Sequence, residues 1–471
     1  MEISHIPFLS TTELSQLIKT KNISPVEATQ AYLERISQVD SSLNSYITVC
    51  GEQALSEAEQ AESDIANGKY LGPMHGIPVA VKDQFWTKGI QTTNGSTIHK
   101  GWIPGEDATV ISNLKSNGAI LLGKLNMSEY ASGDAFHHPY GRPKNPWDLS
   151  RNPGTSSSGS GAATAACLCS TSLGEDTGGS IRGPASFCGL VGIRPSWGRV
   201  SRYGVFPASW SMDTVGPISR TTEDCAMTLK AIAGYDPKDP YTWNQPVPDY
   251  ASELTGDIRG TKIGVITERV DTDANDYEVK DLVKTAISAL GNAGAILSEI
   301  SIPLIAHSAA ISSTIISCDA AALTRRDLEQ NLDQLDHNNQ VRLLMGSIMP
   351  ADAYLKAMKL RELLRSQILE ALTKVDVLVM PTSSIPAPKI PDKAGVTSKE
   401  EVLEGFKGRR SFTSPFNLAN TPALSICCGF TSDILPVGLQ IVGKPFAEST
   451  IFKVAYGYQS ITDWHTQRPS V

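Results

Sequence analysis

The sequence predicts an α/β protein whose core is a large mixed, mostly parallel β-sheet with helices on both faces. Two observations lead to this prediction. Short apolar segments rich in β-branched residues alternate with helical patterns along the chain, and helical patterns end on glycines that lead into strands. The chain can bury a large core, because 41% of its 471 residues are hydrophobic. No linker divides it, so we expect a single domain over residues 1–471.

The first helix is predicted from its N-terminal signals. Ser24 is a capping residue, Pro25 suits the first helical turn, and Glu27 stands three residues after the cap, as in a capping box. Apolar residues at helical spacing follow, so we predict a helix over about residues 25–38 and a second over about residues 52–67.

Two further helical patterns, over residues 110–117 and 279–293, are each followed by Gly-Ala-Ile-Leu, starting at Gly118 and Gly294. Glycine adopts the left-handed conformation that closes a helix, so the chain turns from there into a strand. Apolar runs predict strands at residues 76–81, 261–266, 376–380, 423–428 and 436–442. Residues 302–372 are mostly helical in pattern and are predicted to form a cap-like region within the domain.

Composition excludes several classes of function. The net charge is −8, from 41 basic and 49 acidic residues, which lacks the basic surface that nucleic acid requires. Eight cysteines without regular spacing do not form a disulfide framework, so we expect a reducing compartment. The chain has no signal-peptide pattern and no run of 18 apolar residues, which predicts a cytoplasmic protein without a membrane partner.

Two loops of small residues are the first candidates for a functional site. Residues 154–161 are Gly, Thr and Ser and lead into an apolar helix, and residues 174–182 again place glycines just before a serine. Adjacent N–H groups around Gly178, Gly179 and Ser180 have the geometry that an oxyanion needs. A phosphate-binding loop is the rival, but that motif demands a lysine before the serine, and here Gly179 precedes Ser180 directly.

A nucleophilic serine needs a base, and none of the eight histidines has a local signature that ties it to a serine. Lys82 follows the apolar run at residues 77–81 and stands at the end of a predicted interior strand. A buried ammonium without a carboxylate tends to lose its proton, and a neutral lysine can accept one from serine. The alternative is a strand-end lysine whose head reaches water and pairs with Asp83.

These segments resemble a known family. Residues 76–83 (Gly-Ile-Pro-Val-Ala-Val-Lys-Asp), the serine-rich loop and residues 176–182 (Asp-Thr-Gly-Gly-Ser-Ile-Arg) look like the three blocks of the amidase signature family, in the same order. The likeness continues at residues 184–204, 213–220, 415–417 and 435–440, and so covers nearly the whole chain. It implies the fold of that family and a serine hydrolase that cleaves linear amides.

The resemblance also implies roles for individual residues. Ser180 would be the acyl-forming nucleophile, Lys82 the base, and Ser156 the bridging serine, with a cis peptide bond before it and an interval of 24 residues between the two serines. The amides of Thr177, Gly178, Gly179 and Ser180 would form the oxyanion hole. Ser157, Asp176 and Arg182 would support the loops, although fold stability alone would also account for them. No metal or organic cofactor is required.

The sequence departs from the family pattern at a few positions near these blocks. Thr155 and Ser158 stand at two places where glycine is usual, Gln84 stands where asparagine is usual, and Glu175 where a small residue is usual. The three positions of the implied catalytic triad, Lys82, Ser156 and Ser180, are retained. We therefore expect differences in loop geometry and in substrate shape.

The resemblance leaves the substrate open. In the glutaminase branch of the family, the A subunit of glutamyl-tRNA amidotransferase, an aspartate stands five residues before the proline of the Pro-x-Asn block, and here that position is Arg410. This reversed charge would repel a substrate α-ammonium and favours a stand-alone amidase. The other candidate substrate-binding residues are Ala131, Ser132, His137, His138 and Arg342.

Three hypotheses of function follow. The first is an amidase that hydrolyses a small carboxamide, the second a glutaminase A subunit of a tRNA-dependent amidotransferase, and the third a non-catalytic nucleotide-binding protein. The expected partner is a small-molecule amide. The sequence is also compatible with a homodimer.

Overall fold

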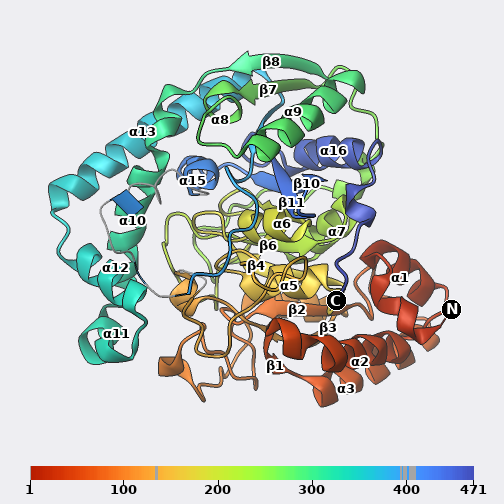
Figure 1. Cartoon of the computed structure of the whole chain (residues 1–471). Coiled ribbons are helices and arrows are strands. Elements are labelled where there is room, and N and C mark those ends of the chain that lie inside the picture. Colours follow the sequence, from red (N-terminus) through yellow and green to blue (C-terminus); the bar gives the residue numbers. More distant parts are fainter. Residues whose placement is uncertain (1, 133–135, 393–394, 396–399, 402–409) are drawn as a thin grey trace.

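The computed structural model describes residues 2–132, 136–392, 395, 400–401 and 410–471. In this part of the chain, eleven strands form one sheet in the order β1-β3-β2-β4-β6-β5-β10-β11-β9-β7-β8, which runs from bottom to top in Figure 1. The strands are β1 (Tyr46–Val49), β2 (Pro78–Lys82), β3 (Ile120–Leu125), β4 (Thr171–Glu175), β5 (Val191–Arg194), β6 (Val215–Ser219), β7 (Lys262–Ile266), β8 (Ile296–Ile300), β9 (Val377–Pro381), β10 (Ala423–Phe430) and β11 (Pro436–Gly443).

The sheet is mixed, as predicted, but parallel pairing does not dominate it. Among the described strands, four pairs are parallel and six are antiparallel. Parallel pairs lie toward the two ends of the sheet, in β3-β2-β4 and β9-β7-β8, and antiparallel strands fill the middle. The expectation of a mostly parallel sheet is therefore wrong. One reason is the connection between β10 and β11, since residues 431–435 are too few for a crossover helix and allow only an antiparallel pair.

The predicted helices are present, with small differences in their ends. Ser24 and Glu27 form the expected capping box at the start of α2. Gly118 and Gly294 follow α4 and α9 with φ of +79° and +96°, as the left-handed closure requires. The described α-helices are α1 (Thr11–Lys19), α2 (Pro25–Leu43), α3 (Gly51–Ala66), α4 (Thr109–Ser116), α5 (Ser158–Ala165), α6 (Arg182–Cys188), α7 (Thr222–Ile232), α8 (Thr267–Val270), α9 (Tyr277–Asn292), α10 (Ser308–Leu323), α11 (Arg325–Gln330), α12 (His337–Ser347), α13 (Ala351–Lys374), α15 (Arg410–Ala419) and α16 (Glu448–Gln459).

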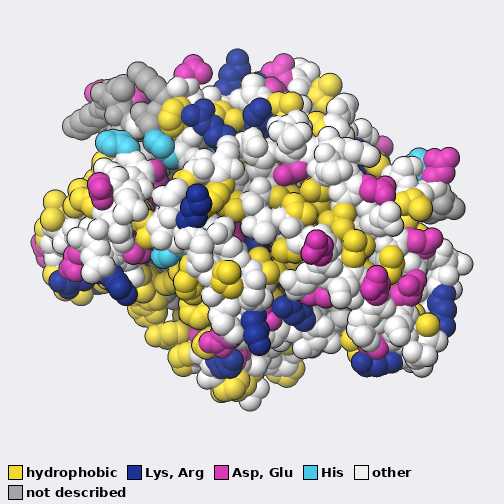
Figure 2. Space-filling model, turned by 90° about the horizontal axis from the view of Figure 1, so that it is seen from below, with side chains coloured by type: hydrophobic (Ala, Val, Ile, Leu, Met, Phe, Trp, Pro, Cys, Tyr) yellow, Lys and Arg dark blue, Asp and Glu magenta, His cyan; other side chains and the backbone are white. Residues whose placement is uncertain are grey.

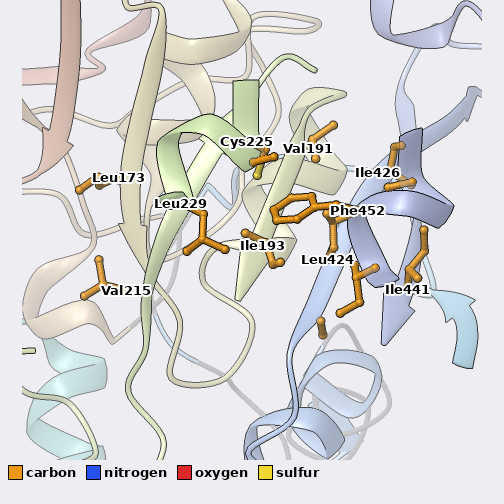
Figure 3. Packing of buried hydrophobic residues seen from close by; sticks show 14 of the residues in the cluster. Leu173, Val191, Ile193, Val215, Cys225, Leu229, Leu424, Ile426, Ile441 and Phe452 are labelled. Atoms are coloured by element: carbon orange, nitrogen blue, oxygen red, sulfur yellow. The ribbon is translucent and has the colours of Figure 1, made fainter. Parts of the chain in front are cut away.

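Apolar packing covers both faces of the central strands. On one face, Leu229 of α7 and Phe452 of α16 lie over Ile193 of β5 and Leu424 of β10 (Figure 3). On the other face, α5 and α6 enclose a smaller cluster of Ala165, Ile181, Ala185, Cys188, Leu190 and Ile218. The α6 helix lies so close to β5 that a Cβ added at Gly192 would come within 2.7 Å of the Cβ of Ala185. The sheet is thus held rigidly at the place where the small-residue loops leave it.

Residues 303–374 form helices α10–α13 with short turns of 3-10 helix, on the left of Figure 1. Their helical character agrees with the sequence prediction. The described helices include one stretch, Pro303–Leu323, that is long and apolar enough to cross a membrane, and 61% of its most apolar 18-residue window is buried inside the protein. The core helix of a soluble protein has the same properties, so this stretch is weak evidence for a membrane span.

The surface in Figure 2 carries both signs of charge. Lysine and arginine side chains are scattered among aspartate and glutamate on this face and do not gather into one basic patch. This pattern agrees with the net charge of −8.

Candidate active site

The serine-rich loop and the carboxyl ends of β2 and β4 meet at one place. β2 and β4 are neighbouring parallel strands with Val81 opposite Leu173, so Lys82 and Glu175, at the ends of the two strands, lie at the same edge of the sheet. The serine-rich loop reaches this edge, because Ser157 Oγ donates a hydrogen bond of 3.4 Å to the carbonyl oxygen of Glu175. The segment after β3 joins from the side, where the N–H of Ser128 donates to the carbonyl oxygen of Ser156 at 3.3 Å.

Lys82 is fully buried, with 0% of its side chain exposed. Its Nζ is hydrogen-bonded to Ser156 Oγ at 2.8 Å and lies 3.6 Å from Glu175 Oε2. Burial lowers the pKa of Lys82 below its ordinary value of 10.5. The alternative in which Lys82 reaches water and pairs with Asp83 is therefore wrong. Asp83 turns the other way and forms an ion pair with Lys124 of β3, at 2.9 Å between Oδ1 and Nζ.

The serine-rich loop packs tightly against the start of α6. The peptide bond between Thr155 and Ser156 is cis. Gly154 has a φ of +98°, and a Cβ there would come within 2.6 Å of the Cα of Pro184. Thr155 and Ser158, which stand at positions where the family usually has glycine, are both buried, and Ser158 begins α5.

The loop that carries Ser180 is organised by Asp176. The N–H groups of Gly179 and Ile181 donate to the Asp176 carboxylate at 2.8 and 3.2 Å. Gly179 has a φ of +118° and lies against Thr413, whose hydroxyl donates to the carbonyl oxygen of Gly178 at 2.7 Å. Ser180, the last residue of this turn, is 9% exposed.

These contacts bear on the predicted oxyanion hole. The N–H of Gly179 already donates to Asp176, so in this structure it does not offer a donor to a substrate oxygen. Among the described residues, the N–H groups of Thr177, Gly178 and Ser180 have no acceptor. The oxyanion hole stays a prediction, with these three groups as the available donors.

Arg182 fixes the same loop from the other side. Its guanidinium is fully buried and contacts both oxygens of Asp176, at 3.0 and 3.1 Å, and it also donates to Gln440 and Asn417. Burial alone would raise the pKa of Asp176, but Arg182, Arg194 and Asn417 outweigh it and hold this pKa well below its usual range. Arg182 and Asp176 thus touch the loop that carries Ser180 at several points, while Ser157 contacts the end of β4.

Sequence reasoning missed a chain of polar side chains behind Lys82. Thr177 Oγ1 lies 2.7 Å from both Glu175 Oε1 and Asp213 Oδ1. Burial raises the pKa of Glu175 to about 8, with a further contribution from Asp213, and burial also raises the pKa of Asp213. Asp213 reaches Thr177 because β6 pairs antiparallel with β4, with Val215 opposite Glu175. The available signal was the unusual residue at position 175, but the register that brings Asp213 to it could not be deduced.

The predicted substrate residues lie on several elements. Ala131 ends a 3-10 turn (Glu129–Ala131), and the buried Ser132 follows it. This turn contacts the start of α12, where Asn339 Nδ2 donates to the carbonyl oxygen of Glu129 at 3.0 Å, and Arg342 follows one turn later. His137 and His138 lie beyond residues 133–135 and are half-buried. Arg410 begins α15, but its side chain lies outside the described part of the chain.

Comparisons with known proteins show the family of the chain. The Amidase family model matches residues 27–452. The chain is also similar to the A subunit of glutamyl-tRNA(Gln) amidotransferase from Moorella thermoacetica, at 41% identity over 489 residues, covering 98% of this chain and 99% of the relative.

Solved structures of two kinds are also similar. The peptide amidase of Stenotrophomonas maltophilia has a TM-score of 0.87 at 30% identity, with 98% of each chain covered. The A subunit of glutamyl-tRNA(Gln) amidotransferase from Thermotoga maritima has a TM-score of 0.80 at 32% identity, covering 96% of this chain and 94% of that one. With the family model matching most of its length, the chain belongs to the amidase signature family of hydrolases that act on C–N bonds.

Proposed function

We propose that this protein is a cytoplasmic, stand-alone amidase that hydrolyses a small linear carboxamide through an acyl-enzyme on Ser180. The observation that supports this most strongly is the fully buried Lys82, whose Nζ lies 2.8 Å from Ser156 Oγ. A lysine in this setting favours its neutral form, and a neutral amine hydrogen-bonded to a serine can act as a base.

Acylation moves two protons and makes one bond. Ser156 passes its hydroxyl proton to Lys82 Nζ and takes the proton of Ser180, while Ser180 Oγ attacks the amide carbon. Negative charge grows on the carbonyl oxygen, and N–H groups of the loop at Thr177, Gly178 and Ser180 are the donors available to stabilise it.

The C–N bond then breaks as a proton returns from Lys82, through Ser156, to the leaving nitrogen, which departs as ammonia or an amine. Water attacks the acyl ester on Ser180, with the same relay accepting its proton. The second product is a carboxylic acid, and Ser180 regains its hydroxyl.

A fluorophosphonate probe tests this proposal without knowledge of the substrate, because it reacts covalently with activated serines. We expect labelling of Ser180, its loss in Ser180→Ala, and a strong reduction in Lys82→Ala. Circular dichroism of each variant serves as the control for folding. Labelling that persists in Ser180→Ala would refute the assignment of the nucleophile.

The glutaminase A subunit is the second candidate, because the amidotransferase relative is 41% identical over almost the full length. Arg410 counts against it, since an arginine stands at the position of the glutaminase branch's aspartate, five residues before Pro415. Ammonia release from glutamine, and co-purification with other subunits, would favour this candidate. Release from primary amides by the isolated chain, with glutamine ignored, would favour the stand-alone amidase.

A further inference from the structure

The buried side chains of Lys82, Glu175, Thr177 and Asp213 form a row of polar contacts. The two contacts of the Thr177 hydroxyl in this row require two hydrogens, and the hydroxyl supplies only one. Thr177 Oγ1 lies 2.7 Å from a carboxyl oxygen of Glu175 and 2.7 Å from one of Asp213. A hydroxyl has one hydrogen and can donate to only one of them. Two oxygens at 2.7 Å need a hydrogen between them, so the second contact carries a proton that belongs to a carboxyl group.

The backbone around the two carboxyl groups indicates which of them is protonated. Asp213 accepts the N–H groups of Ala208 and Ser209 at 2.8 to 2.9 Å, and such donors stabilise an ionised carboxylate. Among the described residues, Glu175 Oε2 has no hydrogen-bond partner and faces Lys82 Nζ at 3.6 Å. Glu175 is therefore the group that is easier to protonate.

The charged side chains on neighbouring elements do not change the conclusion that Glu175, and not Asp213, is the protonated group. Arg182 of α6 pairs with Asp176, and Arg194 at the end of β5 donates to the carbonyl oxygens of Asp176 and Met212 at 2.6 Å. These two buried cations balance the two anions Asp176 and Asp213. Arg202, which also acts on Asp213, pairs with Asp239 at 3.4 Å. Lys82 and Glu175 remain, and the buried cluster is neutral overall when both are charged or when both are neutral.

We propose that Glu175 carries, on Oε1, the proton that its chain with Thr177 and Asp213 requires, and thereby keeps Lys82 as an uncharged base in the resting protein. The Oε1–H of Glu175 donates to Thr177 Oγ1, and Thr177 donates to Asp213 Oδ1. The neutral pair differs from the charged pair by the position of one proton. That proton is bound to Nζ of Lys82 in the charged pair and to Oε1 of Glu175 in the neutral pair, so the total number of protons is the same. Glu175 is thus a positioning residue that acts through Lys82. The inference rests on the proposed function, because it concerns the base of that reaction.

The pH dependence of the probe reaction distinguishes the neutral pair from the charged pair. Glu175→Gln imitates the protonated acid, since its amide donates to Thr177 and its oxygen faces Lys82. The rate of Ser180 labelling should fall toward low pH, and we call this part of the pH profile the acid limb. If Glu175 is already neutral, the pH at the midpoint of the acid limb moves by less than about 0.3 pH unit in this variant. If Glu175 is an anion that holds the proton on Lys82, removal of its charge lowers the midpoint by about one unit or more, and the inference is overturned.

Asp213→Asn provides an opposite test that does not depend on the first variant. An asparagine amide donates to Thr177, so the threonine hydrogen turns to Glu175 and stabilises its ionised form. We expect the acid limb to move to higher pH by about one unit, because an anionic Glu175 returns the proton to Lys82. An unchanged limb in Asp213→Asn would contradict the inference.

The matched control is Glu223→Gln, a half-buried glutamate on α7 outside this site, which should leave both the rate and the limb as in the wild type. Peptide mapping of the labelled wild type separates the two proposals. Absence of label on Ser180 defeats the proposed function itself. Label on Ser180 together with a lowered limb in Glu175→Gln defeats only the role of Glu175.

Discussion

Two lysines lie fully buried on neighbouring strands, Lys82 of β2 and Lys124 of β3, and they differ in how completely their amino groups are partnered. Lys124 Nζ has three acceptors, namely Asp83 at 2.9 Å, the carbonyl oxygen of Phe85 at 2.8 Å and Thr92 Oγ1 at 2.7 Å. Lys82 Nζ contacts Ser156 at 2.8 Å, and the nearest carboxyl group in the described part of the chain, that of Glu175, is 3.6 Å away.

We infer that this difference separates a structural cation, Lys124, from the proposed base, Lys82. Three acceptors match the three N–H groups of an ammonium, so Lys124 is held as a cation even though burial acts to lower its pKa. Lys82 has a hydroxyl at hydrogen-bond distance and a carboxyl group that is itself easy to protonate. Burial alone therefore does not identify a catalytic lysine, and the number and kind of acceptors around it are decisive.

The largest expected effect is the loss of activity in Lys82→Met. Without the base, the reaction of Ser180 with the probe should slow by about 10²- to 10⁴-fold, which is the usual contribution of general base catalysis. Thermal unfolding should change little, because Glu175 can remain neutral next to an apolar side chain. Probe labelling and a melting curve measure the two effects, and a wild-type labelling rate in this variant would contradict the comparison.

Lys124→Met should act on stability. It leaves the buried Asp83 without its cation, and breaking such a pair costs about 3–5 kcal/mol. Urea unfolding measures this loss, and the double variant Lys124→Met with Asp83→Asn should recover part of it. If Lys124→Met unfolds at the same urea concentration as Lys82→Met, the two lysines do not differ as we infer.

Thr92→Val removes one of the three acceptors around Lys124. A hydrogen bond to a charged group contributes about 1.5–3 kcal/mol, so the free energy of unfolding should fall by an amount in that range. The same urea measurement tests it, with wild type as the reference. A stability equal to that of the wild type would mean that Lys124 does not need its full set of acceptors.

The smallest effect concerns pH. Protonated Lys82 cannot accept a proton, so the rate of labelling should fall as the pH falls, and the midpoint should lie below 10.5 because burial lowers the pKa of Lys82. Thr92→Val should shift this midpoint by less than about 0.3 unit, because Thr92 contacts Lys124 and not Lys82. A midpoint at or above 10.5, the ordinary pKa of lysine, would mean that a group other than Lys82 controls the fall in rate. A midpoint that shifts in Thr92→Val would mean the same.

Much of the architecture could be predicted from local patterns. The capping box at Ser24, the glycine closures at Gly118 and Gly294, and the apolar runs of β2, β7, β9, β10 and β11 depend on neighbours in the sequence, and they are found as expected. The balance of parallel and antiparallel strands could not be predicted, because it depends on which strands lie side by side, as when β6 comes between β4 and β5.

The site shows the same division. The family motifs point to Lys82, Ser156 and Ser180, and the structure brings Lys82 and Ser156 within hydrogen-bond distance. The engagement of the Gly179 N–H by Asp176 was not foreseen, because it depends on the turn geometry of the loop. The contact of Thr177 with Asp213, 36 residues further along the chain, could not be foreseen either, because it is made by strand pairing.

The sequence alone determined the local elements and supplied the candidate site residues that they carry, because capping, helix closure and motif spacing are short-range properties. The tertiary structure alone decided how the buried charges are shared. It paired Asp83 with Lys124 and left Lys82 beside Ser156 and Glu175. The physical reason is that the proton affinity of a buried group depends on the donors, acceptors and charges within a few ångströms of it, and the fold brings these together from distant parts of the chain.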